Sequence, residues 1–142
     1  MNNNSYLITP FLAWLAAGCI KFLINSIRAK KLAFSLIGYG GLPSNHSAIV
    51  SSMTALIVLN EGIYSPAFGV ALTLSFIVLL DANSLRRAVG QHAVLINQLV
   101  KDNIEVKPLR ERMGHSKVEI VAGIVVGIFV AIIIKSFLGG YL

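Results

Sequence analysis

The sequence predicts an all-α protein, a polytopic bundle of about four membrane-embedded helices, and three observations support this prediction. Hydrophobic residues make up 56% of the 142 residues, and charged residues make up only 13%, against roughly 25% in an ordinary soluble domain. Long apolar stretches alternate with short polar segments. A chain so poor in charge cannot cover a water-exposed surface, so lipid is expected to cover it. The length fits one domain, residues 1–142.

Each apolar stretch is interpreted as one helix. The expected spans, in chain order, are residues 6–23, 47–59, 66–80 and 118–138. Pro10 lies near the start of the first, where the opening helical turn tolerates proline. The second is short, because a span needs roughly 17 to 25 residues, so its neighbours are expected to shelter it. The third is expected to continue as a helix past the membrane.

The polar segments between these spans are interpreted as loops. Gly38–Pro43 is a glycine-rich loop that leads into the second span. Asn60–Ser65 is a short turn, and Pro66 after it suits the first position of the third helix. Lys101–Ser116 is polar and contains Pro108, so it is predicted to be an extramembrane loop or lid.

Four alternating spans place most of the charge on one side of the membrane. Eleven of the twelve Lys and Arg residues fall on that side, as do all three histidines, and Lys135 is the exception. Because the basic residues lie between apolar runs, the net charge of +6 favours anionic lipid headgroups or phosphate over nucleic acid as partners. The positive-inside rule places this side in the cytoplasm, and the expected location is the bacterial inner (cytoplasmic) membrane.

The second span begins with Pro43-Ser44-Asn45-His46-Ser47. Ser44 suits the N-cap position, and the free N–H groups of a first helical turn form an anion site. His46 in that turn can donate a proton to a phosphate oxygen. The alternative is a capped helix with an interfacial histidine.

Lys21 and Arg28 stand seven residues apart near the end of the first span, so both project from one helix face. A charge inside a span costs roughly 2.5 to 3.5 kcal/mol on insertion scales, which makes such residues functional candidates. The alternative is snorkelling, which we prefer for Lys30 and Lys31.

Asp81, Arg86 and Arg87 follow the third span. Adjacent arginines point in different directions on a helix, so at most one is expected to enter a shared site. A guanidinium fork suits phosphate, and Asp81 can orient an arginine or lysine there. The alternative is an ordinary positive flank of a membrane helix.

His115 and Glu119 open the last span at i, i+4 spacing, which places them on one helix face. A carboxylate on one imidazole nitrogen fixes the tautomer and leaves the other nitrogen as nucleophile or base. The alternative is a salt bridge without catalytic role. His92 is interpreted as a solvated surface residue. Because Cys19 is the only cysteine and carboxylates are few, no metal site is expected.

Together these residues resemble the type 2 phosphatidic acid phosphatase and vanadium haloperoxidase superfamily, specifically its short divergent membrane branch. The motifs of that superfamily are Lys-x6-Arg-Pro, Pro-Ser-Gly-His and Ser-Arg-x5-His-x3-Asp. The similar segments here are Lys21-x6-Arg28-Ala29, Pro43-Ser44-Asn45-His46 and, split in two, Arg86 with His115-x3-Glu119. Arg86-x5-His92 has the usual spacing, but Ile96 then occupies the acid position, so we choose His115.

The resemblance implies a membrane phosphatase that hydrolyses a lipid phosphate or pyrophosphate without metal or other cofactor. His115 would be the nucleophile that forms a phosphohistidine, Glu119 would orient it, and His46 would protonate the leaving oxygen. The implied phosphate-binding residues are Lys21, Arg28, Ser44 and Arg86. The alternative function is a non-catalytic membrane protein that binds anionic lipid, or a transporter component.

Two features concern the architecture. The superfamily fold has about six helices, whereas about four are expected here. Gly123-x3-Gly127 in the last span permits close helix packing, either within the fold or between the protomers of a homo-oligomer.

Overall fold

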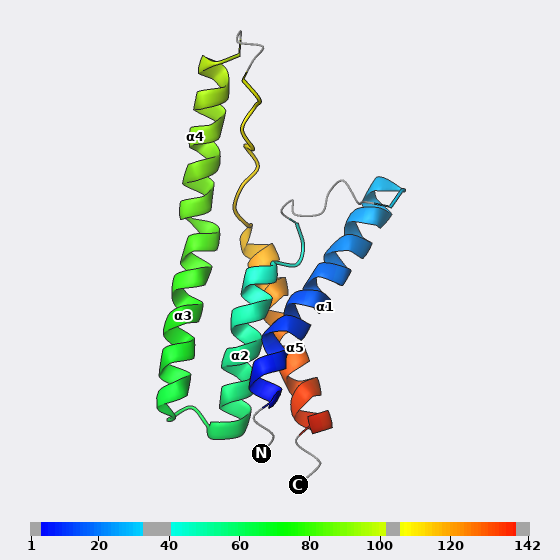
Figure 1. The fold of residues 1–142 in the computed structure, drawn as a ribbon, viewed down its shortest axis with the longest axis vertical. Helices are drawn as coiled ribbons and strands as arrows, with labels where there is room; N and C mark the ends of the chain where they lie inside the picture. The colour runs from blue at the N-terminus through cyan, green and yellow to red at the C-terminus, as the bar shows by residue number, and fades with distance from the viewer. Residues whose placement is uncertain (1–3, 33–40, 102–105, 139–142) are drawn as a thin grey trace.

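The computed structural model describes residues 4–32, 41–101 and 106–138, and the regular structure in these ranges is entirely α-helical (Figure 1). This confirms the predicted fold class. The predicted loop Gly38–Pro43 lies partly outside the described residues. The helices, in chain order, are α1 (Asn4–Ala29), α2 (Asn45–Glu61), α3 (Pro66–Asn83), α4 (Leu85–Leu99) and α5 (Lys117–Leu138).

Among the described residues, three helical segments are long and apolar enough to cross a membrane. They are Asn4–Ala29, Pro66–Leu99 and Lys117–Phe137. Large apolar side chains lie exposed along them, as expected of helices that face lipid. The chain is therefore an integral membrane protein. Of the four spans predicted, the second is not among these three, and its helix α2 has 17 residues, the fewest that a span needs.

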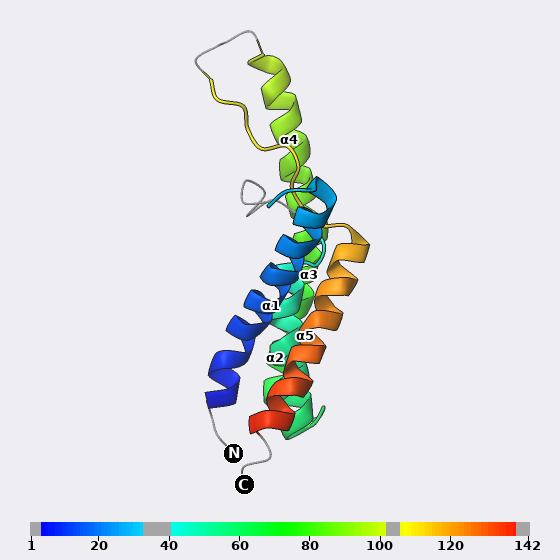
Figure 2. The same ribbon diagram turned by 90° about the vertical axis from the view of Figure 1, so that its right-hand side faces the viewer.

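The short helix α2 lies among the other helices and contacts α1, α3 and α5 (Figures 1 and 2). The expectation that its neighbours shelter it is confirmed. Its hydroxyl side chains are satisfied inside the bundle: Thr54 shares a hydrogen bond with Ser75 of α3 at 2.8 Å. The residues of α2 that are buried are Ser47, Ala48, Val50, Ser52, Leu56 and Ile57.

Helices α2 and α5 approach each other backbone to backbone. A Cβ atom on Gly123 would collide with the carbonyl oxygen of Ser44, and one on Gly127 would collide with that of Ala48. Only glycine permits this approach. The Gly123-x3-Gly127 motif therefore packs within one chain, and a homo-oligomer stays a prediction that needs another surface.

The third helix continues as predicted, but with a break at Ser84, where α3 gives way to α4. The hydroxyl of Ser84 donates to the carbonyl oxygen of Leu80 at 2.6 Å, an arrangement that often bends a helix. Helix α4 extends beyond the other helices, and residues 106–116 run back along it; this stretch is called the return segment (Figures 1 and 2). Asn97 holds this return segment by bonding both the N–H and the carbonyl oxygen of Leu109, each at 2.8 Å.

The two ends of the bundle differ in chemistry. Helix α1 begins and α5 ends at the lower end in Figure 1, where the Tyr6 hydroxyl donates to Glu61 at 2.7 Å. At the other end lie the start of α2, the α3–α4 junction and the start of α5. The helices alternate in direction as predicted, and this alternation brings the candidate residues to the same end of the bundle.

Candidate functional site

The start of α5 is built around Glu119. Its Oε2 accepts from the Ser116 N–H at 2.9 Å, and the Ser116 hydroxyl accepts from the Glu119 N–H at 3.2 Å, which is a capping box. The same oxygen lies 3.3 Å from Nδ1 of His115. The expectation of a shared helix face is wrong in detail, because α5 begins at Lys117 and His115 lies just before it.

His115 is fixed by its backbone as well as its ring. Its N–H donates to the carbonyl oxygen of Ala82 in α3 at 2.9 Å. Gly114 makes this turn possible, since it has φ +84° and a Cβ there would press against Arg87. The His115 side chain is 9% exposed. This anchoring from two helices fixes the ring position.

The environment favours a neutral His115. Burial lowers the pKa of His115 below its ordinary value, the Glu119 carboxylate opposes that shift, and the positive charges of Lys21 and Arg86 add to it. A proton on Nδ1 can be donated to Glu119, so the neutral ring keeps its lone pair on Nε2.

Ser44 joins the starts of α2 and α5. Its Oγ accepts from the N–H of Ser47 at 3.3 Å and from the Ser47 hydroxyl at 2.9 Å, so its predicted N-cap position is confirmed. Its own N–H donates to the carbonyl oxygen of Glu119 at 2.9 Å. Ser44 is fully buried, and its predicted contact with a phosphate group stays a prediction.

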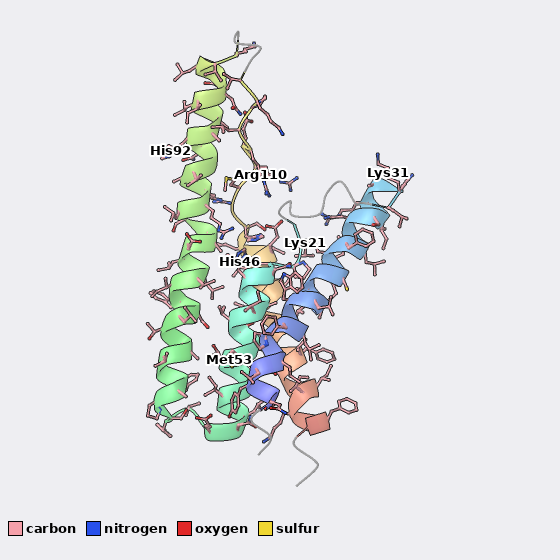
Figure 3. All side chains as sticks on the ribbon, in the orientation of Figure 1. Lys21, Lys31, His46, Met53, His92 and Arg110 are labelled. Carbon is pink, nitrogen blue, oxygen red and sulfur yellow. The ribbon has the colours of Figure 1, made fainter. Side chains whose placement is uncertain are left out.

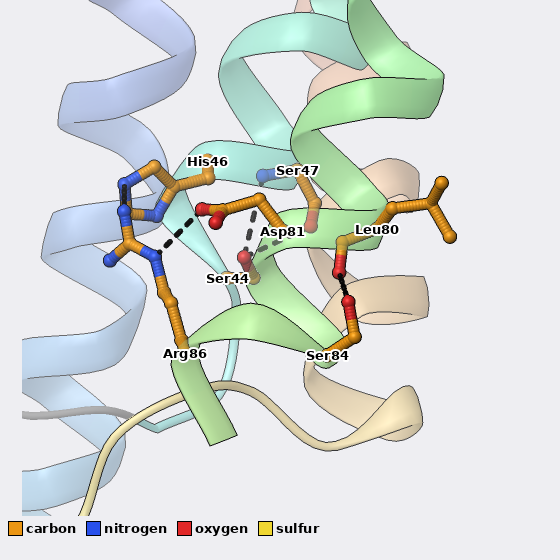
Figure 4. Close-up of polar contacts among 7 residues, drawn as sticks. All are labelled: Ser44, His46, Ser47, Leu80, Asp81, Ser84 and Arg86. Carbon is orange, nitrogen blue, oxygen red and sulfur yellow. Dashed lines mark hydrogen bonds and ion pairs between the residues drawn. The ribbon is translucent and has the colours of Figure 1, made fainter. Parts of the chain in front are cut away.

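Arg86 links the α3–α4 junction to α2 (Figure 4). Its Nε donates to Oδ2 of Asp81 at 3.1 Å, and its Nη2 lies 3.3 Å from Nε2 of His46. Both the Arg86 and Asp81 side chains are a little over a third exposed. Of the two arginines, Arg86 is the one that reaches His46, while Arg87 packs beside Gly114.

The two histidines face each other across the site. The ring centroids of His46 and His115 lie 6.1 Å apart and the rings are tilted by 55°. Lys21 of α1 is half-buried and interacts electrostatically with both rings and with Glu119. Figure 3 shows Lys21 and His46 at the same level of the bundle. Residues from all five helices, and His115 just before α5, thus meet at one place.

Other basic residues and the third histidine stand apart from this cluster. Arg28 is exposed in the last turn of α1, and none of the hydrogen bonds or ion pairs among the described residues joins it to the site. Its role as a phosphate ligand stays a prediction. Lys31 lies just beyond the end of α1, where its snorkelling stays a prediction, and His92 is exposed on α4, as predicted (Figure 3).

Sequence reasoning missed one part of the site and predicted another only in outline. The capping box at Ser116 has a recognisable signal, Ser-x-x-Glu before an apolar run. The expected pairing of Asp81 with an arginine is present, with Arg86 as the arginine, but it crosses a helix break at Ser84 that no local pattern predicts. Within the described ranges, no three His, Cys, Asp or Glu side chains form a group able to hold a metal ion; the absence of a metal from the reaction stays a prediction.

Fold and site define an integral membrane protein of the helical-bundle class, with two imidazoles, a carboxylate and fixed cations gathered at one end of the bundle. The model of the "Divergent PAP2 family" matches residues 2–130. The "Uncharacterized membrane protein YuiD" of Bacillus subtilis (strain 168) is 31% identical over 151 residues, covering 94% of this chain and 96% of that protein. The chain belongs to the Divergent PAP2 family, which confirms the predicted resemblance. No solved structure matches the chain.

Proposed function

We propose that the protein is a membrane phosphatase that hydrolyses a lipid phosphate or pyrophosphate through a phosphohistidine on His115. The observation that carries this proposal is the meeting of His46 and His115, with ring centroids 6.1 Å apart, beside Lys21 and Arg86. Two imidazoles can serve as nucleophile and proton donor, while fixed cations stabilise the charge of the transferring phosphoryl group. Membership of the Divergent PAP2 family supports this reaction class.

His115 is suited to act as the nucleophile. Glu119 accepts from Nδ1, so the lone pair on Nε2 is available to attack phosphorus. As the N–P bond forms, the bond between phosphorus and the lipid oxygen breaks. Water then attacks the phosphohistidine, the N–P bond breaks, and inorganic phosphate leaves. Burial favours the neutral, nucleophilic ring by lowering the pKa of His115.

His46 would carry the proton between these two steps. The negative charge of an arriving phosphate favours the imidazolium form, which His46 reaches by taking a proton from solvent. The leaving lipid oxygen takes that proton in the first step, and the attacking water returns one in the second. Lys21, Arg86, Ser44 and Arg28 are the proposed phosphate-binding residues, and the first two interact electrostatically with both imidazoles.

The site lies where a lipid substrate would present its headgroup. The cluster is at one end of helices whose outer surfaces are apolar, so an acyl or prenyl chain can remain in the bilayer. The positive-inside rule supports a cytoplasmic site in the inner membrane. Labelling a cysteine placed at Lys107 with a membrane-impermeant reagent, in cells whose Cys19 is replaced by Ser, tests that orientation; labelling from outside would contradict it.

The test of the function is release of inorganic phosphate from lipid phosphates by the purified protein in detergent with a chelator present. We expect turnover by the wild type, inhibition by vanadate, and loss of turnover in His115→Ala. The matched control is His92→Ala, because His92 is exposed on α4 and away from the cluster. It is expected to keep wild-type activity.

A second measurement distinguishes the mechanism from the alternative. Brief exposure to a lipid phosphate labelled on phosphorus should leave acid-labile, base-stable label on the wild type and none on His115→Ala. Binding of lipid phosphates by the wild type without release from any of them would overturn the proposal. That result would instead favour a protein that binds anionic lipid without catalysis.

A further inference from the structure

The contacts of Arg86 determine the protonation of His46. A guanidinium group has N–H donors only, so His46 must accept the hydrogen bond from Nη2 of Arg86 through its Nε2. An accepting Nε2 carries no proton. His46 is therefore neutral in this structure, with its one ring proton on Nδ1.

The proton on Nδ1 has no acceptor within the part of the chain that the structure describes. Nδ1 of His46 is buried and lacks a hydrogen-bond partner among the described residues. Buried polar groups are almost always paired, so an orphaned donor calls for an explanation. A ligand oxygen supplies one, because a phosphoryl oxygen bound between the two imidazoles could accept from Nδ1.

Asp81 holds Arg86 in the orientation that keeps His46 neutral, with its proton on Nδ1. Its carboxylate binds Nε of Arg86, on the inner edge of the guanidinium group, while Nη2 reaches His46 (Figure 4). Asp81 lies in the last turn of α3 and Arg86 in the first turn of α4, so the pair also spans the break at Ser84. Without the carboxylate, nothing among the described contacts holds Nε.

We propose that Asp81 is a positioning residue: it anchors Arg86 so that His46 is kept as the Nδ1–H tautomer, with that N–H reserved for an oxygen of the bound phosphoryl group. The inference rests on the proposed function for the identity of the anion. When phosphate arrives, Nη2 of Arg86 turns from His46 to a phosphate oxygen while Asp81 keeps Nε. The freed Nε2 then takes a proton from solvent, and His46 becomes the acid that the first step needs.

The experiment is nitrogen NMR of protein labelled with ¹⁵N-histidine in detergent, which reports the protonation of each ring nitrogen. His92→Gln and His46→Gln assign the signals of these rings. In the wild type we expect His46 with a proton on Nδ1 and none on Nε2, and conversion to imidazolium on addition of vanadate. In Asp81→Ala we expect mixed tautomers, and in Asp81→Asn, which keeps an acceptor oxygen, recovery of the wild-type state.

The matched control is Glu111→Ala, which removes another carboxylate that accepts from a nitrogen donor on α4, here Asn97. It should leave His46 unchanged. A wild-type His46 protonated on Nε2, or an Asp81→Ala protein with the wild-type tautomer, would overturn the inference. Because the readout needs no turnover, a protein without phosphatase activity but with the expected tautomers contradicts the proposed function alone.

Steady-state kinetics test the positioning role of Asp81 independently of the NMR measurement. Because Asp81 touches no reacting atom, Asp81→Ala should raise KM for a lipid phosphate roughly tenfold while kcat falls less, and Asp81→Asn should restore most of the loss. Equal losses of kcat in both variants, without a change in KM, would contradict positioning through Arg86.

Discussion

The two halves of the site are held in place by different means. The half on α5 is held by backbone groups: the His115 N–H bonds Ala82, the Ser116 N–H bonds Glu119, and the Ser44 N–H bonds the Glu119 carbonyl oxygen. The half at the α3–α4 junction is held by side chains alone, from Asp81 through Arg86 to His46. Its two charged members are more than a third exposed, whereas the His115 side chain is 9% exposed.

This difference suits the two tasks proposed for the halves. A nucleophile gains from a fixed position and a fixed tautomer, because misplacement by a fraction of an ångström slows the reaction. A group that binds an incoming anion and gives up a proton must change its partners during the cycle. Side-chain contacts across an interrupted helix permit that change, and backbone contacts within a capped helix do not.

The largest effect is expected from breaking the fixed half at Glu119. Glu119→Gln keeps the size of the side chain but removes the charge that orients and stabilises the His115 ring. We expect kcat/KM for a lipid phosphate to fall on the order of 10²- to 10⁴-fold. Steady-state phosphate release measures this effect. Glu111→Gln, on the exposed return segment, is the matched control and should retain wild-type rates.

Glu119→Gln should also shift the pH dependence of kcat/KM in a defined direction. His115 must be neutral to attack, so activity falls as pH drops through the pKa of His115, which burial already lowers. Since the Glu119 carboxylate raises that pKa, Glu119→Gln should move the acid limb of the kcat/KM profile to lower pH even as the plateau falls. An acid limb that stays in place, or moves to higher pH, would show that Glu119 does not act on His115.

The halves also differ in how well the sequence predicts them. The helices follow from long apolar stretches, and the gathering of charge at one end follows from their alternation, while the contact of His115 with Glu119 follows from a spacing of four residues. For Arg86 the sequence indicates only that Asp81 can orient an arginine or lysine, because the geometry of that ion pair depends on a helix break and the contact with His46 depends on how α2 packs. Arg28 is predicted as a site residue from its helical spacing with Lys21 and from the motif, but the orientation of α1 relative to the bundle decides its distance from the site.

The short helix α2 also shows that the sequence does not predict how the helices pack. A hydropathy pattern treats it as one more span, whereas its 17 residues contact three other helices and its buried residues include Ser47 and Ser52. Gly123-x3-Gly127 indicates close packing, but it does not say whether the partner is in the same chain or in a second protomer. The structure shows that the atoms against these glycines belong to the N-cap and first turns of α2 in the same chain, and most of them are backbone atoms.

A smaller effect, and one that couples the two halves, is expected from Gly123→Ala. The added methyl group would collide with the carbonyl oxygen of Ser44, so α2 must move away from α5. That movement strains the bond between the Ser44 N–H and the Glu119 carbonyl oxygen and separates His46 from His115. We expect a loss of about 1 to 3 kcal/mol in the free energy of unfolding, typical of an overpacked interior, together with lower activity.

Unfolding in mixed micelles, followed by circular dichroism, measures that loss, and Gly69→Ala is the matched control. Gly69 lies in α3, where an added Cβ would meet no atom within 4 Å, so alanine should be neutral or stabilising by up to about 1 kcal/mol. If both variants are as stable and active as the wild type, contact between α2 and α5 does not hold the halves together. If Gly123→Ala stays folded but loses activity, the spacing of the two imidazoles is what the glycine protects.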